Sequence, residues 1–345
     1  MLVQNYIWKG DTMIYCKKCH CQLDENNIDT KDSRYCTSCA ITQREFFKSR
    51  RNLLHILYNL PLEVKIEKTK HLIQEAVEEF GLDHVYISYS GGKDSTVLSH
   101  IAKELYPDIL HIFANTTCEY PETIQHIQWE TKENNTNLIT VLPKTKDGNI
   151  WTFKKLVEHY GYPVFSKRIS NAIRTYQHAV TPITKQHSID YINRNFKKYD
   201  KYKELCISDK CCEILKKNPI QKKAREFNMD CAILGILASE SRQREQDWIK
   251  YGCNVFHKKT ENQCRPLLFW TENDILEYIK KYNVKISKLY ELGYERNGCM
   301  YCAFGVHLEN TPNRFQRLKV THPKHHAYLV RNFGKLLYSF GIDTE

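Results

Sequence analysis

The stretch from Val85 to Leu98 constrains the fold more than any other part of the chain. It opens with Val-Tyr-Ile-Ser-Tyr, a β-branched and aromatic run that is typical of a buried strand. It then turns through Gly91 and Gly92 and continues with helical apolar spacing from Thr96. A strand that passes through a glycine-rich turn into a helix directs backbone N–H groups and the positive end of a helix dipole at one point. The sequence therefore predicts a phosphate site at this turn.

The side chains of the turn favour a triphosphate with its metal ion. Ser90 and Ser95 can donate hydroxyl groups, Lys93 supplies a cation, and Asp94 could hold Mg²⁺. The order differs from G-x-x-x-x-G-K-[ST], because the two glycines are adjacent and an acid follows the lysine. Ser-Gly-Gly-Lys-Asp-Ser resembles the PP-loop of the N-type ATP pyrophosphatases, which split ATP between the α and β phosphates to adenylate a substrate. The resemblance implies that ATP is bound by Ser90, Gly91, Gly92, Lys93, Asp94 and Ser95.

The segments around this loop alternate between helical and strand patterns. Residues 62–80 have helical apolar spacing and end at Gly81, and a second helix is expected over 96–105. Further strands are predicted at 109–114, 138–142 and 231–237, and Thr271 is a candidate N-cap of a later helix. Strands that alternate with helices predict a doubly wound, mostly parallel α/β sheet with its ligand at the carboxyl ends of the strands.

Four parts of the chain are expected. They are a zinc-ribbon-like module at 1–45, a basic, aromatic connector and a helix at 46–80, a PP-loop α/β domain at 81–270, and a helical C-terminal part at 271–345 that carries cysteines. The α/β domain includes a basic, tyrosine-rich insertion at about 151–225 with weak helical periodicity.

A first set of cysteines has the spacing C-x2-C-x16-C-x2-C, formed by Cys16, Cys19, Cys36 and Cys39. Each C-x2-C turn places two thiolates on one ion, and two such turns complete the tetrahedron of a structural Zn²⁺ site. A segment this short has little core, so the metal would hold it together. His20 and Cys21 lie beside the first pair as alternative ligands.

A second set consists of adjacent cysteines and a distant C-x2-C pair, namely Cys211, Cys212, Cys299 and Cys302. This spacing is poor for a zinc knuckle, but four thiolates can hold a [4Fe–4S] cluster. Lys-Cys-Cys-Glu at 210–213 resembles the Cys-Cys segment of iron–sulfur adenylylsulfate reductases, and Arg-Asn-Gly-Cys-Met-Tyr-Cys at 296–302 resembles their Arg-x-Gly-Cys-x-x-Cys segment. The resemblance implies that these four cysteines are cluster ligands.

Other segments resemble the phosphoadenosine-phosphosulfate reductase superfamily in the same order along the chain. They are Glu-Tyr-Pro-Glu-Thr at 119–123, Gly235 with Glu240-Ser241 and Arg244, and Pro266-Leu267 with Trp270-Thr271. The resemblance covers roughly residues 62–320 and implies an adenine nucleotide alpha hydrolase-like fold. We expect Lys93, Asp94 and Arg244 to be the catalytic residues, with Arg244 adding a cation at the crevice.

Two departures from the reductases indicate a different reaction. The sulfonucleotide reductases have a degenerate phosphate loop, whereas this loop is intact, and no cysteine of a Glu-Cys-Gly-type tail follows Cys302. We therefore expect an ATP-dependent sulfurtransferase, closest to the Dnd-type DNA phosphorothioation sulfurtransferases or the PP-loop tRNA thiolases. Cys118 and Cys206 are candidates for a persulfide. The alternatives are a sulfonucleotide reductase and a non-catalytic module that binds nucleic acid or senses redox state.

Charge favours an anionic partner. The net charge is +11, and residues 154–225 hold 17 Lys and Arg against 6 Asp and Glu, which is an excess of 11 in that stretch alone. Interleaved tyrosines at 176, 191, 199 and 202 and a basic run at 314–319 would suit DNA or tRNA. A sulfur donor such as a cysteine desulfurase is a further expected partner. No apolar run approaches the ~20 residues of a membrane span, so we expect a soluble, cytoplasmic protein.

Overall fold

The computed structural model describes residues 14–24, 26–256 and 261–345. Its centre is a six-stranded sheet of order β3-β2-β1-β5-β7-β6, in which neighbouring strands are parallel except β6 and β7. The strands predicted at 109–114, 138–142 and 231–237 are present but shorter. The sheet consists of β1 (Val85–Tyr89), β2 (Leu110–Ala114), β3 (Leu138–Val141), β5 (Cys231–Leu234), β6 (Asn254–Val255) and β7 (Asn262–Cys264).

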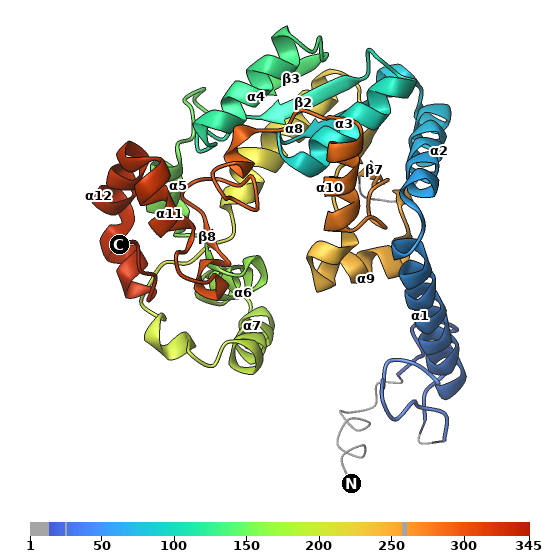
Figure 1. Ribbon diagram of the computed structural model, residues 1–345. Helices are drawn as coiled ribbons and strands as arrows, with labels where there is room; N and C mark the ends of the chain where they lie inside the picture. The colour runs from blue at the N-terminus through green and yellow to red at the C-terminus, as the bar shows by residue number, and fades with distance from the viewer. Residues whose placement is uncertain (1–13, 25, 257–260) are drawn as a thin grey trace.

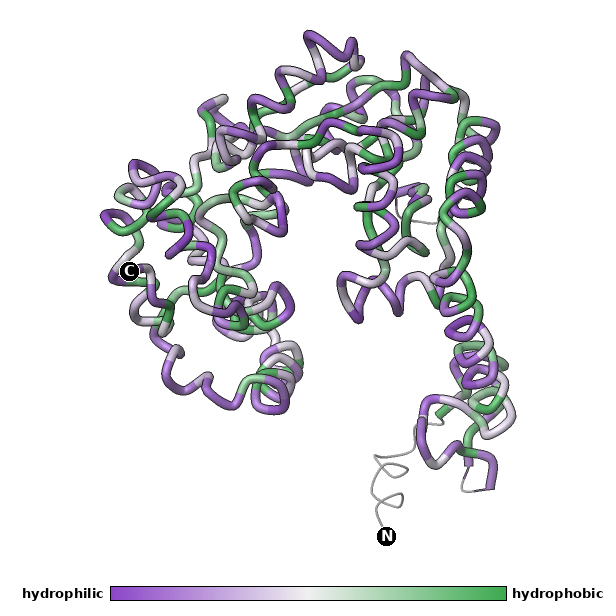
Figure 2. The backbone as a smooth tube through the Cα atoms, viewed as in Figure 1, coloured by the Kyte–Doolittle hydropathy of each residue, from purple (hydrophilic) through white to green (hydrophobic). Residues whose placement is uncertain are grey.

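Helices cover both faces of this sheet, as expected for a parallel sheet. Side chains alternate along β1, so Val85, Ile87 and Tyr89 enter the main core beneath α2 (Leu62–Phe80) and α3 (Lys93–Leu105). Tyr86 points to the other face, where α8 (Asn218–Glu226) packs on β2 and β3. Figure 2 shows the hydrophobic stretches that run along these strands. The predicted α/β fold with a mostly parallel sheet is confirmed.

The helix predicted at 62–80 is α2, and it ends at Gly81 as expected. The predicted cap of the later helix is also confirmed, because the Thr271 side chain accepts a hydrogen bond from the backbone N–H of Asp274 at the start of α10 (Glu272–Lys281). Asp274 also accepts a hydrogen bond from the buried Lys65 ammonium at 2.6 Å, which ties α10 to α2. The remaining single turns of helix are at 82–84, 199–201, 213–217, 238–240, 288–290 and 306–308.

A second hydrophobic core lies to one side of the sheet (left in Figure 1). It joins the basic insertion to the end of the chain, two segments that the sequence gives no reason to pair. Parallel strands β4 (Val164–Phe165) and β8 (Ala303–Phe304) form its small sheet. Its helices are α5 (Phe153–Tyr160), α6 (Lys167–His178), α7 (Pro182–Asn195), α11 (Arg314–Thr321) and α12 (Pro323–Ser339).

The segment expected to be a connector is helical. Helix α1 (Thr37–Tyr58) runs unbroken through position 45, where the sequence places a boundary, and it projects away from the sheet (Figure 1). It buries only Ala40, Leu54 and Leu57, so its apolar periodicity is too sparse to be recognised from sequence. The helix rests on α9 (Arg242–Tyr251), where the Arg50 guanidinium lies 4.5 Å from the centre of the Trp248 ring. No helix of the described residues is both long and apolar enough to cross a membrane.

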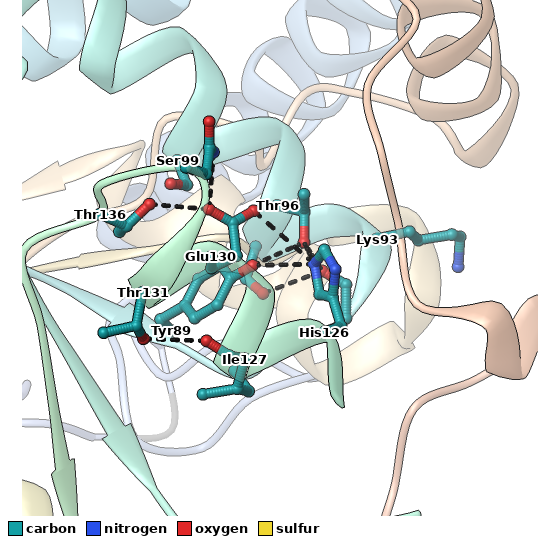
Figure 3. A network of polar contacts seen from close by, with 12 residues as sticks. Tyr89, Lys93, Thr96, Ser99, His126, Ile127, Glu130, Thr131 and Thr136 are labelled. Carbon is teal, nitrogen blue, oxygen red and sulfur yellow. Dashed lines mark hydrogen bonds and ion pairs between the residues drawn. The ribbon is translucent and has the colours of Figure 1, made fainter. Parts of the chain in front are cut away.

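A buried polar network fixes α4 (Pro121–Lys132) against the phosphate-loop helix α3 (Figure 3). The Tyr89 hydroxyl lies 3.0 Å from Thr96 Oγ1 and 3.1 Å from His126 Nε2. Glu130 then accepts hydrogen bonds from Thr136 and from Asn134. Because buried polar groups lose stability when a partner is removed, this network holds the start of α3 in one position.

Buried His111 on β2 makes stability depend on pH. Its Nε2 accepts a hydrogen bond from Ser99 Oγ at 2.8 Å, and its Nδ1–H donates to the Ile109 carbonyl at 2.9 Å, so the neutral ring is satisfied. Burial lowers the pKa of His111 to about 4, although Glu130 opposes the shift. The unfolded chain therefore binds a proton more readily below pH 6.5, and the stabilisation is lost as the pH falls towards 4.

We predict that the free energy of unfolding falls by about 2 kcal/mol more in the natural chain than in His111→Gln between pH 7.5 and pH 5. Urea unfolding at the two pH values measures this difference. The exposed His71 provides the matched control, because His71→Gln should keep the full loss. Equal losses in all three proteins would show that His111 carries no such linkage.

Candidate nucleotide and metal sites

The phosphate loop follows β1 and leads directly into α3. Gly91 has a φ of +71°, and Gly92 is the N-cap, so the helix begins at Lys93 rather than at the predicted residue 96. The Ser95 hydroxyl donates to the Gly92 carbonyl at 2.9 Å and lies 3.0 Å from the Ser90 hydroxyl. These bonds close the loop on itself and leave the first N–H groups of α3 at its open side.

Close packing makes two glycines necessary here. A Cβ on Gly91 would lie 3.0 Å from Cδ1 of Ile127 on α4, and the positive φ would itself strain any other residue. Gly235, just after β5, approaches the loop from the neighbouring strand. A Cβ there would lie 3.0 Å from the Asp94 carbonyl oxygen and from Ser95 Cα. The loop therefore fills the space between two strand ends, which sets its position.

Lys93 is almost fully buried and is held by residues from late in the chain. Its Nζ lies 3.2 Å from a carboxylate oxygen of Glu272 and donates to the Glu295 carbonyl at 3.3 Å. Its backbone N–H donates to the Tyr290 hydroxyl at 2.8 Å. Lys93 points away from the buried network around Tyr89 (Figure 3), so its charge is directed at the open side of the loop.

Asp94 has the properties of a metal-ion ligand. Burial raises its pKa, while the charges of Lys93, Arg244 and Arg296 act in the opposite direction. Its Oδ1 is buried and accepts no hydrogen bond within the described residues. A buried carboxylate oxygen without a donor is suited to Mg²⁺, which prefers oxygen ligands. Arg244 forms an ion pair with Glu240, and its charge is felt at Asp94.

Asn297 links the loop to the second cysteine pair. Its Nδ2 donates to the Ser90 carbonyl at 3.0 Å, and its Oδ1 accepts from the Thr123 hydroxyl at 2.9 Å. Cys299 follows two residues later, so the chain that clamps the loop continues directly into Cys299-Met-Tyr-Cys302. Sequence reasoning missed Asn297 and Tyr290. The signal for Asn297 was its place inside the Arg-x-Gly-Cys motif.

A cavity of about 280 Å³ adjoins this loop at the carboxyl ends of the strands. Its volume is near the lower end of the range for small-molecule sites. Tyr86, Phe113 and Ile220 give it apolar walls, and Ser90, Asn297 and Gly298 place it beside the loop. Glu119, Lys216 and Lys217 add charged groups. The cavity is therefore in the position where a nucleoside would lie if its phosphates occupied the loop.

Tyr162 brings the two halves of the second cysteine set together. Its backbone carbonyl accepts from the N–H of Ser208, three residues before Cys211. Its hydroxyl donates to the Tyr301 carbonyl at 2.6 Å, and the adjacent Pro163 carbonyl accepts from the N–H of Ala303. One extended segment in the second core therefore binds the residues before Cys211 on one side and the Cys299–Cys302 turn on the other.

The four sulfurs of this set influence one another. Contact with Cys212 raises the pKa of Cys211, and the same contact lowers the pKa of Cys212 to about 5 against the effect of burial. Burial raises the pKa of Cys302 to about 12, and the charges of Cys299 and Cys212 add to it. The ionised Cys299 is the largest cause of the raised pKa of Lys216, a half-buried cation on the turn after Cys212.

These cysteines fit a cluster better than a single ion. Cys211 Sγ and Cys212 Sγ lie 3.9 Å apart, but among the described residues the set as a whole does not gather its sulfurs closely enough for one ion. In a [4Fe–4S] cluster the thiolates bind different irons, so their sulfurs stand farther apart. Lys216 would offset the negative charge of such a group. It too was missed from sequence, although it follows Cys212 by four residues.

The first set is a compact group of four cysteines. The sulfurs of Cys16, Cys19, Cys36 and Cys39 all lie within 4.8 Å of one another, and Cys19 Sγ and Cys36 Sγ are 3.8 Å apart. Four thiolates around Zn²⁺ at about 2.3 Å stand about 3.8 Å apart, so the spacing fits this ion. Burial alone would raise the pKa of Cys16, but backbone N–H groups directed at its sulfur lower it to about 5.

The other cysteines and the tyrosines of the insertion lie differently from what base stacking or sulfur relay requires. Cys118 is buried, and burial raises its pKa, whereas Cys206 is exposed with its thiol directed at the Tyr160 carbonyl. Tyr199 is buried, and Tyr202 stacks on Phe196. The interpretation of these two tyrosines as stacking surfaces was wrong, because they complete the second core.

We predict that Asn297→Ala weakens ATP binding about tenfold, because two hydrogen bonds that hold the loop are lost. Isothermal titration with ATP and Mg²⁺ measures the change, and thermal unfolding checks the fold. Asn332→Ala is the matched control, since it removes an amide hydrogen bond to the Tyr328 carbonyl on α12. Equal affinities in both variants would contradict the clamp.

Metal analysis tests the first cysteine set. Cys36→Ser should lose one equivalent of zinc per chain, because three thiolates bind the ion far more weakly than four. Cys21→Ser, which removes an exposed cysteine beside the group, should keep its zinc. Loss of zinc from both variants, or from neither, would overturn this ligand set.

Comparison with known proteins agrees with the arrangement of loop and strands. The model of the phosphoadenosine phosphosulfate reductase domain matches residues 84–181 and 168–304. The chain is 24% identical over 263 residues to the uncharacterized protein MJ0973 of Methanocaldococcus jannaschii, covering 75% of this chain but 48% of that protein. The chain therefore spans about half the length of that relative.

Two relatives carry a functional name. The phosphoadenosine 5′-phosphosulfate reductase of Xylella fastidiosa is 23% identical over 223 residues, which cover 63% of this chain and 71% of the reductase. The crystal structure of phosphoadenylyl-sulfate reductase from Candida auris superposes with a TM-score of 0.45 at 14% identity, over 74% of this chain and 95% of that one. The family match extends over well more than half of the chain. The chain belongs to the phosphoadenosine phosphosulfate reductase domain family.

Proposed function

We propose that this protein is an ATP pyrophosphatase that adenylates an acceptor and then transfers sulfur to it, with nucleic acid as the acceptor. One observation carries the proposal. The segment from Tyr290 to Cys302 holds the phosphate loop through Tyr290, Glu295 and Asn297, and ends in two of the four cysteines of the second set. Nucleotide loop and cysteines are thus built as one site.

The residues of the loop suit cleavage between the α and β phosphates. The acceptor oxygen would attack the α-phosphorus, and the bond to the β-phosphate oxygen would break to release pyrophosphate. The N–H groups at the start of α3 and the Lys93 ammonium would stabilise the departing charge. Asp94 would hold Mg²⁺ through its unpaired Oδ1, and Arg244 and Arg296 would add positive charge beside it.

Adenylation makes the acceptor oxygen a leaving group that departs as part of AMP when sulfur attacks. A [4Fe–4S] cluster held by Cys211, Cys212, Cys299 and Cys302 would supply a sulfur-binding centre next to this acceptor. The chain's own contribution is to bury these cysteines, to place Lys216 beside them, and to exclude water with the second core. A separate sulfur donor, such as a cysteine desulfurase, would supply the sulfur.

A basic surface supports the nucleic-acid acceptor. Helices α6 and α7 lie in the stretch with 17 Lys and Arg against 6 Asp and Glu. On that surface, Arg168 lies over the Tyr191 ring at 4.8 Å and Lys185 over the Tyr176 ring at 5.3 Å, which leaves cations at the surface of the aromatic groups. Phosphate backbones bind such surfaces with strong salt dependence.

Reduction of a sulfonucleotide is the second candidate, because the family match and the Xylella fastidiosa relative carry that name. The two reactions use the same adenosine cavity but differ in the phosphate loop. A substrate that is already adenylylated needs no pyrophosphate cradle, whereas this chain keeps Lys93 and Asp94 in place. Sulfite release from adenylylsulfate with a thiol reductant, without ATP cleavage, would favour the reductase.

We predict that the anaerobically purified protein releases pyrophosphate from ATP when the acceptor is present, and that Lys93→Met lowers the rate at least ~100-fold. The assay compares DNA, tRNA and no nucleic acid. Lys335→Met, at an exposed lysine of α12, is the matched control and should retain the natural rate. Release of inorganic phosphate in place of pyrophosphate would contradict α–β cleavage.

A further inference from the structure

A second cavity, of about 520 Å³, lies beside Cys299 and is separate from the nucleoside cavity. Its walls are the chain from Tyr294 to Cys299 and the chain from Phe304 to Arg317. Gly298 lines both cavities, so one stretch of backbone divides them. A Cβ built on Gly298 meets no atom within 4 Å, which shows that both sides of this divide are open at that point.

Three arginines line the second cavity, and two of them have no carboxylate partner among the described residues. Arg314 is paired with Glu309 and donates to the Cys302 carbonyl. Arg296 and Arg317 form no ion pair in the described parts of the chain. Arg317 lies over the ring of Tyr294 at 5.6 Å, and that ring is fixed because its hydroxyl bonds to Thr321. The Arg317 guanidinium is thus held at the wall without a counter-charge.

We propose that this cavity binds a phosphate ester of the acceptor, with Arg317 and Arg296 as its cationic contacts. Guanidinium groups bind phosphate oxygens in a fixed, paired geometry, which makes arginine suited to this ligand. The cavity adjoins Cys299, and the charge of Arg296 also acts on Asp94 in the nucleotide loop. An acceptor held there would face the α-phosphate and the cysteines together. This assignment rests on the proposed function.

Binding of labelled nucleotides tests the cavity directly. The probes are a fluorescein-labelled single-stranded oligonucleotide, as DNA and as RNA, and thymidine 5′-monophosphate as competitor. Arg317→Gln should raise the Kd for the phosphate ester about tenfold and lower the salt slope of strand binding by about 1. Arg331→Gln is the matched control, because Arg331 also lies over a tyrosine ring, at 5.9 Å, but on exposed α12.

A second variant guards against loss of folding. Asn310→Asp changes an exposed residue of the cavity wall and adds a negative charge, so it should also weaken binding. Strong competition by the mononucleotide would identify a small-molecule acceptor, and binding of the strand alone would identify nucleic acid; either result with Arg317 dependence supports the cavity. Equal Kd values for Arg317→Gln and Arg331→Gln would overturn it.

ATP titration separates this inference from the proposed function. Arg317-dependent binding in a protein that does not bind ATP would support the cavity and contradict the pyrophosphatase. ATP-dependent pyrophosphate release with acceptor affinity unchanged in Arg317→Gln would do the reverse.

Discussion

The hydrogen bonds between the phosphate loop and the segment from Tyr290 to Asn297 are the constraint on which the rest of the site depends. Tyr290 accepts from the Lys93 N–H, Glu295 accepts from the Lys93 ammonium, and Asn297 donates to Ser90. These contacts join residues about 200 positions apart, so the loop has its observed form only when the late segment is docked. Because the same segment ends at Cys299 and Cys302, docking also delivers two cysteines to the loop.

The second core provides the other half of this arrangement. Tyr162 is completely buried and bonds to both cysteine-bearing segments, so the basic insertion is part of the framework that holds the cysteines. This explains why Tyr199 and Tyr202 are packed inside. The charged helices α6 and α7 remain on the surface, and the charge that favours an anionic acceptor is thus carried by the same segment that orders the metal ligands.

Local patterns were sufficient to predict the phosphate loop, most strands, α2 and the cap of α10, because each depends on residues that are close in sequence. Helix α1 escaped prediction because it buries few residues and is held by α9 through Arg50. Asn297 and Tyr290 could not be assigned, since their roles exist only after distant segments meet. The pairing of the insertion with the C-terminal helices likewise depends on tertiary contacts, for which the sequence has no short-range signal.

The central claim is that Cys211 and Cys212 join Cys299 and Cys302 in one iron–sulfur centre beside the nucleotide loop. Iron and sulfide analysis of the anaerobically purified protein, with its visible absorption spectrum, tests this most directly. The account predicts four irons per chain, lost in both Cys212→Ser and Cys299→Ser and retained in Cys206→Ser. A colourless protein without iron that still binds ATP would contradict it.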